Sequence, residues 1–244
     1  MLRRNILLGI IPPKPIPRFP ITKAKENKRR AKTHLMLYYE NQAKKKGFRF
    51  IIGVDEAGCG PLAGPVVASA VLLKSRKFQN RIDDSKKITA RQREKAFHEI
   101  FQNAYVGTSV VNEAVIDSQN ILKARFLAMN WAVERLIAQL SKTHTQDGFS
   151  GQVCLLIDGN SFRTDLPYSY QTIIRGDNRS LSIACASIIA KVIRDRVLYI
   201  YDKVFPQYGF RQHKGYPTRA HREAILKNGF SPIHRKTFRC RSPA

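Results

Sequence analysis

Short apolar runs alternate with longer segments of helical periodicity along this chain, and that alternation limits the folds it can adopt. Strands and helices that interleave in this way favour an α/β class, with a mixed central sheet flanked by helices. No apolar window approaches the ~18 residues that a membrane-spanning helix needs, so no such helix is predicted and no membrane partner is expected through one. The predicted strands cover residues 50–54, 66–73, 105–111, 153–157 and 170–174, and the predicted helices cover residues 36–46, 89–101, 117–140, 180–201 and 217–227.

The chain is strongly basic, with 43 Lys and Arg against 18 Asp and Glu among 244 residues and a net charge of +25. A charge of that size repels itself in a compact fold, and a polyanionic partner is the usual compensation. Nucleic acid is the first candidate partner and an anionic membrane surface is the second. The four cysteines are far apart and form no Cys-x-x-Cys pair, which argues against a zinc site and favours reduced thiols in a cytoplasmic protein.

Composition sets an arm at residues 1–47 apart from a core that begins at residue 48. Residues 1–49 hold 14 Lys and Arg against two acids, and five prolines between residues 12 and 20 favour an extended, flexible arm. The arm is a nucleic-acid-binding segment, a targeting peptide or an upstream over-read of the start codon. Its prolines and its lack of serine disfavour the targeting peptide. Met36 is a credible alternative start.

Acids are scarce in this chain, and four of them follow predicted strands beside glycines. Asp55 and Glu56 close the first strand, Asp158 closes the strand at 153–157, and Asp177 follows the strand at 170–174. Carboxylates at the ends of neighbouring strands converge and repel one another unless a proton or a cation intervenes. All-oxygen ligation suits Mg²⁺ or Mn²⁺, and such a cluster in a basic protein implies metal-assisted phosphodiester hydrolysis.

An ordinary turn is the alternative for these acids, because Asp-Gly and Gly-Asp are common turn dipeptides. For Asp158-Gly159 taken alone, that alternative stays open. It is weaker for Asp55-Glu56, since two adjacent acids directly after a buried strand are costly without a partner.

Several motifs, in order along the chain, resemble those of bacterial ribonuclease HII, a type 2 ribonuclease H. They are GVDEAGCGPLAGPV at 53–66, DSKK at 84–87, LIDG at 156–159, GD at 176–177, SIACASIIAKV at 182–192, RD at 194–195, YGF at 208–210, HKGYPT at 213–218 and HR at 234–235. The ordered set spans roughly residues 48–238 and is far more specific than any one motif. The resemblance implies a ribonuclease H-like catalytic core at residues 48–203 and a helical, substrate-binding C-terminal extension at 204–244.

The resemblance also implies an activity. Such an enzyme hydrolyses the RNA strand of RNA–DNA hybrids and cuts 5′ to ribonucleotides embedded in duplex DNA, leaving a 5′-phosphate and a 3′-hydroxyl. This places the expected role in ribonucleotide excision repair and DNA replication, in a monomeric cytoplasmic protein. By the same resemblance, two Mg²⁺ or Mn²⁺ ions are held by Asp55, Glu56, Asp158 and Asp177.

The resemblance assigns substrate contacts as well. In the family the segment at Gly58-Cys59-Gly60 is usually Gly-Arg-Gly, and its backbone approaches the ribose 2′-hydroxyl, which distinguishes RNA from DNA. Cys59 replaces that arginine here, so one phosphate-directed charge is lost. Its thiol is expected to be a half-buried filler, because no activating base lies nearby in sequence.

Tyr216 is similar to the family tyrosine that stacks on the deoxyribose beside the scissile ribonucleotide, and a buried turn tyrosine is the alternative. His213 is either structural or functional, Arg194 and Asp195 are expected to support the fold, and Ser180 and Ser182 to cap a helix or bind phosphate. The lysines expected to contact phosphate, though each alone is typical of a solvated surface, are Lys86, Lys87 and Lys214.

Two other functions compete with this interpretation. A nucleic-acid-binding protein without catalysis would keep the basic surface, but the presence of all four acids counts against it. The sister enzyme ribonuclease HIII carries a folded N-terminal module, which the proline-rich arm does not resemble, and Tyr216 fits the ribonuclease HII pattern better.

Overall fold

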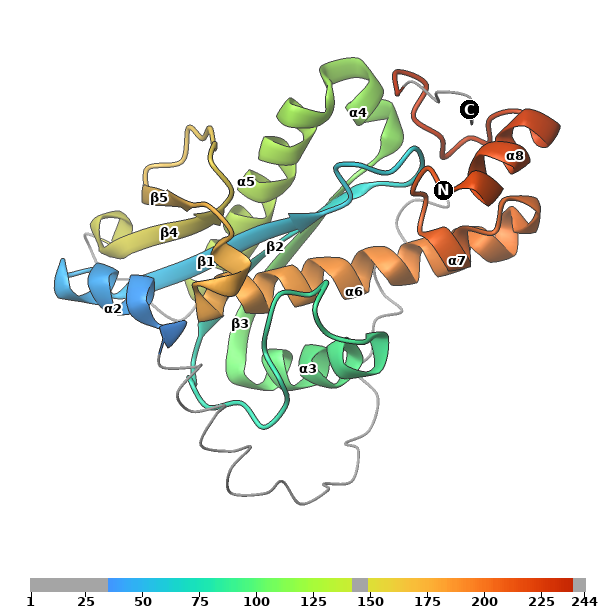
Figure 1. Cartoon of the computed structure of the whole chain (residues 1–244). Helices are drawn as coiled ribbons and strands as arrows, with labels where there is room; N and C mark the ends of the chain where they lie inside the picture. Colours follow the sequence, from blue (N-terminus) through green and yellow to red (C-terminus); the bar gives the residue numbers. More distant parts are fainter. Residues whose placement is uncertain (1–34, 142–148, 239–244) are drawn as a thin grey trace.

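The structure, a computed structural model, describes residues 35–141 and 149–238. Its elements follow the predicted alternation of strands and helices (Figure 1). In chain order they are α2 (Tyr38–Lys45), β1 (Phe50–Ala57), β2 (Val66–Leu73), α3 (Ala90–Asn103), β3 (Ala104–Val111), α4 (Glu113–Gln119), α5 (Ile121–Leu140), η1 (Phe149–Gln152), β4 (Val153–Asp158), β5 (Ser169–Ile173), η2 (Gly176–Asn178), α6 (Leu181–Val204), η3 (Pro206–Tyr208), α7 (Phe210–His213) and α8 (Arg219–Asn228).

The five strands form one mixed sheet, as predicted, and their order in it is β3-β2-β1-β4-β5. The first three strands along the chain pair antiparallel, whereas β4 joins β1 in parallel and β5 joins β4 in parallel. In the β1–β4 register Val54 faces Ile157, so Asp55 and Asp158 follow at the same end of the sheet. This parallel pairing brings together acids that are about one hundred residues apart in sequence.

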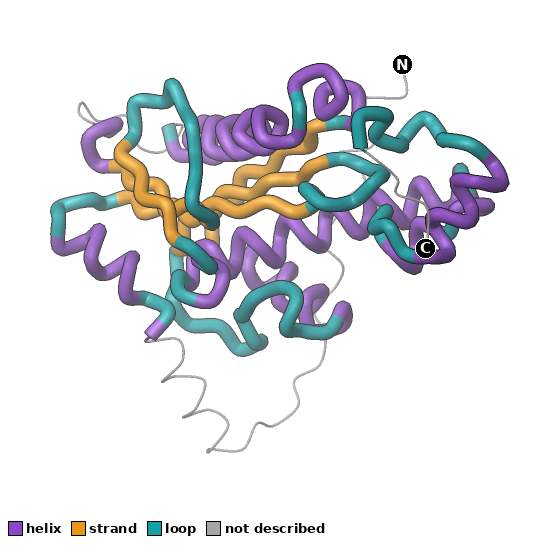
Figure 2. The backbone as a smooth tube through the Cα atoms, turned by 45° about the horizontal axis from the view of Figure 1, so that its top comes forward, coloured by secondary structure: helices purple, strands orange, loops and turns teal. Residues whose placement is uncertain are grey.

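Helices cover both faces of the sheet (Figure 2). Side chains alternate across a strand, so Val67 and Val71 of β2 pack with α6 and α3, while Val66 and Ala68 pack with α5. Helix α6 is buried for most of its first half, which explains why its sequence is an apolar run rather than an amphipathic stripe. Strands β1 and β4, whose ends carry three of the acids, are buried along most of their length.

Helix boundaries are fixed by side-chain caps. Thr89 forms the predicted cap of α3 in a full capping box with Gln92, and Ser180 caps α6. The single helix predicted over 117–140 is wrong, because the chain breaks at Asn120, whose φ is +69°. Its side chain accepts hydrogen bonds from the backbone of Leu122 and Lys123 and so starts α5 anew.

The segment 36–47, which the sequence assigned to the arm, packs on the sheet and α6. Met36 and Leu37 are buried in the same cluster as residues of α6. The Met36 carbonyl accepts a hydrogen bond from the Leu181 backbone amide at 2.8 Å. The packed part of the molecule therefore begins before residue 47, and the remainder of the arm, residues 1–34, lies outside the described residues.

Helices α7 and α8 lie beyond the C-terminal end of α6 (Figure 1). A small core of their own joins them to it, and Leu62, Leu198, Tyr208 and Phe210 are among its buried residues. Within the described ranges, no helix is long and apolar enough to cross a membrane.

Candidate active site

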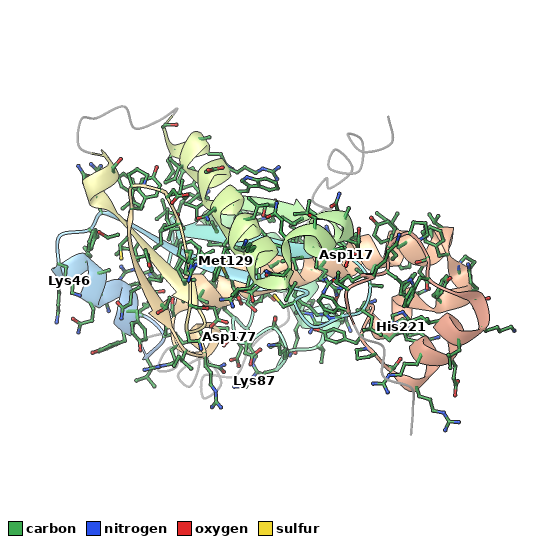
Figure 3. The ribbon with its side chains drawn as sticks, turned by 90° about the horizontal axis from the view of Figure 1, so that it is seen from above. Lys46, Lys87, Asp117, Met129, Asp177 and His221 are labelled. Carbon is green, nitrogen blue, oxygen red and sulfur yellow. The ribbon has the colours of Figure 1, made fainter. Side chains whose placement is uncertain are left out.

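The four acids singled out by the sequence meet at one end of the sheet. Asp55 and Glu56 lie near the end of β1, Asp158 ends the neighbouring β4, and Asp177 lies in η2 just after β5. Figure 3 shows Asp177 on the same side as Lys87, away from the C-terminal helices that hold His221. Asp55 and Asp177 are buried, with 4% and 7% of their surface exposed, so their charges receive little solvation.

The electrostatics of the cluster are those of crowded carboxylates. Burial, followed by repulsion from Glu56 and Asp158, raises the pKa of Asp55 well above its usual range. Burial also raises the pKa of Asp177, with repulsion from Asp158 adding to it. The pKa of Glu56 is raised by burial although Arg125 opposes the shift. These carboxyl groups favour any partner that brings positive charge.

Hydrogen-bond donors of the protein engage only some of the carboxylate oxygens in the cluster. The Asp158 Oδ1 atom accepts a hydrogen bond from the Gly176 amide at 2.6 Å. Glu56 Oε1 lies 3.3 Å from Arg125 Nε, whereas the buried Glu56 Oε2 has no hydrogen-bond partner among residues 35–141 and 149–238. A buried carboxylate oxygen without a partner is costly, and its natural complement is a cation.

This donor set fits a divalent metal. All four groups offer oxygen, the ligand of Mg²⁺ and Mn²⁺. Among the described residues no three His, Cys, Asp or Glu side chains stand close enough to share one ion, so binding an ion requires side chains of the cluster to move.

Arg125 of α5 is a site residue that the sequence did not single out. Its Nη2 atom donates to the carbonyls of Asp158 at 3.3 Å and Ser161 at 3.1 Å, while its Nε faces Glu56. One guanidinium thus ties the end of β4 to the carboxylate at the end of β1. No sequence signal marked it, because a lone arginine on a helix is typical of a solvated face.

The glycine-rich loop after β1 is shaped by close packing and buried arginines. Gly58 has a φ of +106°, and a Cβ there would lie 2.2 Å from Arg194 Nε. Arg194 donates to the carbonyls of Ala63 and Pro65, as expected of a residue that supports the fold. Arg235 donates to the carbonyl oxygens of Gly58, Cys59 and Gly64.

Cys59 contacts the acidic cluster instead of a base. Its Sγ atom lies 3.5 Å from Glu56 Oε1. Burial and the charge of Glu56 raise the pKa of the thiol, so it stays protonated and is not a nucleophile. A half-buried filler matches this environment.

Tyr216 stands next to the glycine loop. A Cβ on Gly60 would lie 3.8 Å from Tyr216 Cε1, and the tyrosine is 41% exposed. The alternative of a buried turn tyrosine is therefore wrong. The Leu62 amide donates to the carbonyl of Gly215 at 2.8 Å and fastens the two loops together.

The three predicted lysines differ in their surroundings. Burial works to lower the pKa of Lys86, but Asp177 and Asp55 outweigh it and the pKa is raised, which places this ammonium within the field of the cluster. Lys87 binds the Asn178 side chain beside Asp177. Lys214 Nζ instead binds the Arg211 carbonyl of its own helix. Only the first two therefore lie with the acids.

Ser180 and Ser182 bind a buried acid of α2 instead of facing the cluster. Both hydroxyls donate to Glu40 Oε1, at 2.7 and 2.8 Å, and the Ser182 amide donates at 2.9 Å. Ser180 still caps α6, but neither hydroxyl is free for phosphate.

Comparison with known proteins decides the family. A model of the ribonuclease HII family matches residues 52–241, which include all four acids and Tyr216. The chain belongs to the ribonuclease HII family. The ribonuclease HII of Syntrophus aciditrophicus is 48% identical over 208 residues, covering 85% of this chain and 92% of that protein. That of Geobacter sulfurreducens is 48% identical over 202 residues, covering 82% and 87%.

Solved structures share the fold. The ribonuclease H2 of Pyrococcus horikoshii matches with a TM-score of 0.59 at 24% identity, covering 79% of this chain and 95% of that one. A ribonuclease HIII crystallised in complex with Mn²⁺ (Bst-RNase HIII) matches with a TM-score of 0.59 at 15% identity, covering 77% and 65%. The ribonuclease H fold is thereby confirmed. As a ribonuclease HII family member, the chain is a divalent-metal-dependent nuclease that hydrolyses the RNA strand of RNA–DNA hybrids.

Proposed function

We propose that this ribonuclease HII family member also cuts on the 5′ side of ribonucleotides embedded in duplex DNA, with two Mg²⁺ or Mn²⁺ ions bound. The proposal is carried by the meeting of four carboxylates at one end of the sheet, with Gly60 and Tyr216 nearby. Asp177, Asp55 and Tyr216 all raise the pKa of Lys86, so this lysine lies close to both the carboxylates and the tyrosine. The proposed ion ligands are Asp55, Glu56, Asp158 and Asp177.

Each part of the site has a distinct task in this proposal. The carboxylates of Asp55 and Asp177 supply the negative charge that holds the ions, and Arg125 orients Glu56 and the end of β4. Held by these carboxylates, divalent ions would supply a water nucleophile at neutral pH and positive charge at the departing 3′-oxygen, and the product would then carry a 5′-phosphate. Lys86 and Lys87 place positive charge beside the substrate phosphates.

Substrate recognition in the proposal comes from two loops. The backbone at Gly58-Cys59-Gly60 senses the 2′-hydroxyl, since no Cβ at Gly60 obstructs close approach. The exposed ring of Tyr216 stacks on the following deoxyribose and favours an RNA-to-DNA junction. On this basis residues 204–244 act as a substrate-binding extension to the catalytic core.

The test uses a DNA duplex that carries one embedded ribonucleotide, and a continuous RNA–DNA hybrid beside it. Each is incubated with the protein in Mg²⁺ and in Mn²⁺, and Asp55→Asn serves as the inactive comparison. We expect a cut on the 5′ side of the ribonucleotide that is lost in the variant. The Tyr216→Ala variant should lose activity on the embedded ribonucleotide at least tenfold more than on the hybrid.

Other outcomes would overturn the proposal. Cleavage of the hybrid alone would indicate the specificity of a ribonuclease HIII and remove the role given to Tyr216. Full cleavage by Asp55→Asn would remove the carboxylate cluster from the chemistry. Equal losses on both substrates in Tyr216→Ala would contradict stacking on the deoxyribose.

A further inference from the structure

Three buried or half-buried histidines lie behind Tyr216, and the mechanism above uses none of them. His221 on α8 is 0% exposed and His234 is 2% exposed, while His213 ends α7. The rings of His213 and His221 are stacked with centroids 4.1 Å apart and planes 17° apart. Such a cluster has to resolve which ring nitrogens carry protons, because buried polar groups need matched partners.

The backbone amide that contacts His234 determines which ring nitrogen of this histidine carries the proton. The Ser231 amide donates to His234 Nδ1 at 2.9 Å, and an amide can only donate, so Nδ1 carries no proton. The remaining nitrogen of a neutral ring, His234 Nε2, then carries the proton. Its partner is His221 Nε2 at 3.0 Å.

The position of the proton on His221 follows independently, from the hydrogen bond made by its other ring nitrogen. His221 Nδ1 lies 2.9 Å from the Tyr216 carbonyl, and a carbonyl can only accept, so Nδ1 carries the proton. In a neutral ring His221 Nε2 is then an acceptor, which matches the proton on His234 Nε2. The two assignments were made from opposite ends and agree at their shared hydrogen bond.

We infer that His234 and His221 form a neutral, proton-ordered relay that positions Tyr216. The inference rests on the proposed role of the Tyr216 ring in recognising the deoxyribose. His221 and His234 are positioning residues here, because they contact the backbone of Tyr216 and not the substrate.

The relay fixes the tyrosine within a fully bonded backbone. The Tyr216 carbonyl accepts from His221 Nδ1 and from the Thr218 amide at 2.8 Å, and the Tyr216 amide donates to the His213 carbonyl at 2.9 Å. With every backbone polar group of Tyr216 engaged, only its ring is left to face the substrate. A residue meant to stack on one sugar needs this restraint.

The other end of the relay reaches the loop that carries Gly60. His234 forms a β-bridge with Ala63, and the next residue, Arg235, donates its amide to the Leu62 carbonyl at 2.8 Å. The two histidines therefore connect both sides of the gap between Gly60 and the Tyr216 ring. Neutrality is essential to this link, since protonation of either ring sets two N–H donors against each other. In agreement, burial lowers the pKa of both His221 and His234 to about 4.

The first test reads protonation directly and does not depend on activity. Long-range ¹H–¹⁵N spectra of the ¹⁵N-labelled full chain near neutral pH distinguish the two neutral tautomers of each ring. We expect the proton on Nδ1 in His221, which is the less common tautomer, and on Nε2 in His234. A proton on Nε2 of His221, or a doubly protonated ring, overturns the inference.

The second test compares two amide replacements. The amide nitrogen of His221→Asn lies near the position of Nδ1 and keeps a donor for the Tyr216 carbonyl, whereas His221→Gln places its amide near Nε2 and leaves that carbonyl without the donor. The readout is the ratio of cleavage rates on an embedded ribonucleotide and on a continuous hybrid. We expect His221→Gln to lower the ratio at least fivefold, and His221→Asn to recover most of it.

Two comparisons keep the outcomes distinct. His98→Gln is the matched control, because His98 lies on α3 and its ring nitrogens make no hydrogen bond among the described residues. If Tyr216→Ala leaves the ratio unchanged, the proposed stacking of its ring on the deoxyribose fails. If Tyr216→Ala lowers the ratio while His221→Gln does not, the sugar contact stands and the relay is overturned.

Discussion

At the scale of single residues, the site trades stability for function. Asp55 lies 4% exposed among like charges, with its pKa raised first by burial and then by Glu56. Glu56 keeps one buried oxygen that no group in the described part of the chain hydrogen-bonds. Amides or apolar groups at these positions would make the fold more stable, so the cost of burying these acids supports the proposed role in binding metal ions.

Asp55→Asn is expected to stabilise the fold while abolishing cleavage. A carboxyl whose folded-state pKa is raised contributes stability below its unfolded value, and that stability is lost as the pH rises through the folded value. At pH 7 the amide escapes this penalty. An increase in free energy of unfolding of about 1–2 kcal/mol, or about 2–8 °C in melting temperature, should appear in EDTA. A variant that melts lower than the wild type in EDTA would contradict the crowding of the carboxylates.

Arg125→Met tests the guanidinium that joins Glu56 to the end of β4. Removing it leaves Glu56 without its ion-pair partner, and we expect a loss of about 2 kcal/mol in EDTA, discounted for partial exposure of both side chains. Mn²⁺ should recover part of that loss, because a bound cation replaces the missing positive charge. The measurement is the melting temperature with and without Mn²⁺.

Arg135→Met is the matched control for that variant. Arg135 lies on the same helix and donates to the Thr108 carbonyl, away from the acids. It should melt with the same response to Mn²⁺ as the wild type. An Arg125→Met protein whose loss Mn²⁺ leaves untouched would show that this arginine has no part in the metal site.

At the scale of elements, α2 is joined to the helix that follows Asp177. Glu40 is 3% exposed and accepts three hydrogen bonds around the start of α6, where the helix dipole favours a negative charge. Ser180, which caps α6, is only three residues after Asp177. The docking of α2 therefore contributes to the placement of one site acid.

Two truncations should differ sharply. Removal of residues 1–35 leaves α2 in place, and we expect hybrid cleavage within about twofold of the full chain. Removal of residues 1–47 strips Met36, Leu37 and Glu40 from the core and exposes the start of α6, so we expect a loss of about 4 kcal/mol or failure to fold. Urea unfolding and cleavage rates measure both. Lost cleavage in the shorter truncation would assign a role in the active site to the segment before α2.

The sequence predicted the sheet, the strand-end position of the acids and the caps at Thr89 and Ser180, because each depends on a local pattern. It missed interactions between distant residues. Glu40 and Ser182 are 142 positions apart, and His221 meets His234 across a turn that hydropathy does not reveal. The predicted continuous helix at 117–140 failed for a local reason, since the positive φ of Asn120 is a backbone property that periodicity does not detect.

At the scale of the whole molecule, two sets of titrating groups act in opposite directions. Burial lowers the pKa of His221 and His234 to about 4, so their contribution to stability is present above about 6.5 and is lost as the pH falls toward 4. Burial raises the pKa of Asp55 and Asp177, so acid relieves their repulsion. The two effects partly cancel in the intact protein.

Separating these sets gives a prediction for acid stability. In the wild type, acid relieves the repulsion around Asp55, and Asp55→Asn removes part of that stabilising effect. Its urea midpoint should therefore fall more steeply than that of the wild type between pH 7 and pH 4.5. His221→Asn removes one of the buried histidines whose protonation destabilises the fold in acid, so the urea midpoint of this variant should fall less steeply. Parallel slopes in all three proteins would contradict this assignment of the buried groups.

The parallel pairing of β1 with β4 has a consequence for synthesis of the chain. Asp55 and Glu56 leave the ribosome about one hundred residues before Asp158, and β2, β3 and α5 lie between β1 and its parallel partner β4 along the chain. A growing or prematurely terminated chain thus carries half of the acids with no neighbouring strand to complete them. Fragments that end before Asp158 lack two of the four carboxylates that we propose to hold the ions, and we expect them to have no nuclease activity.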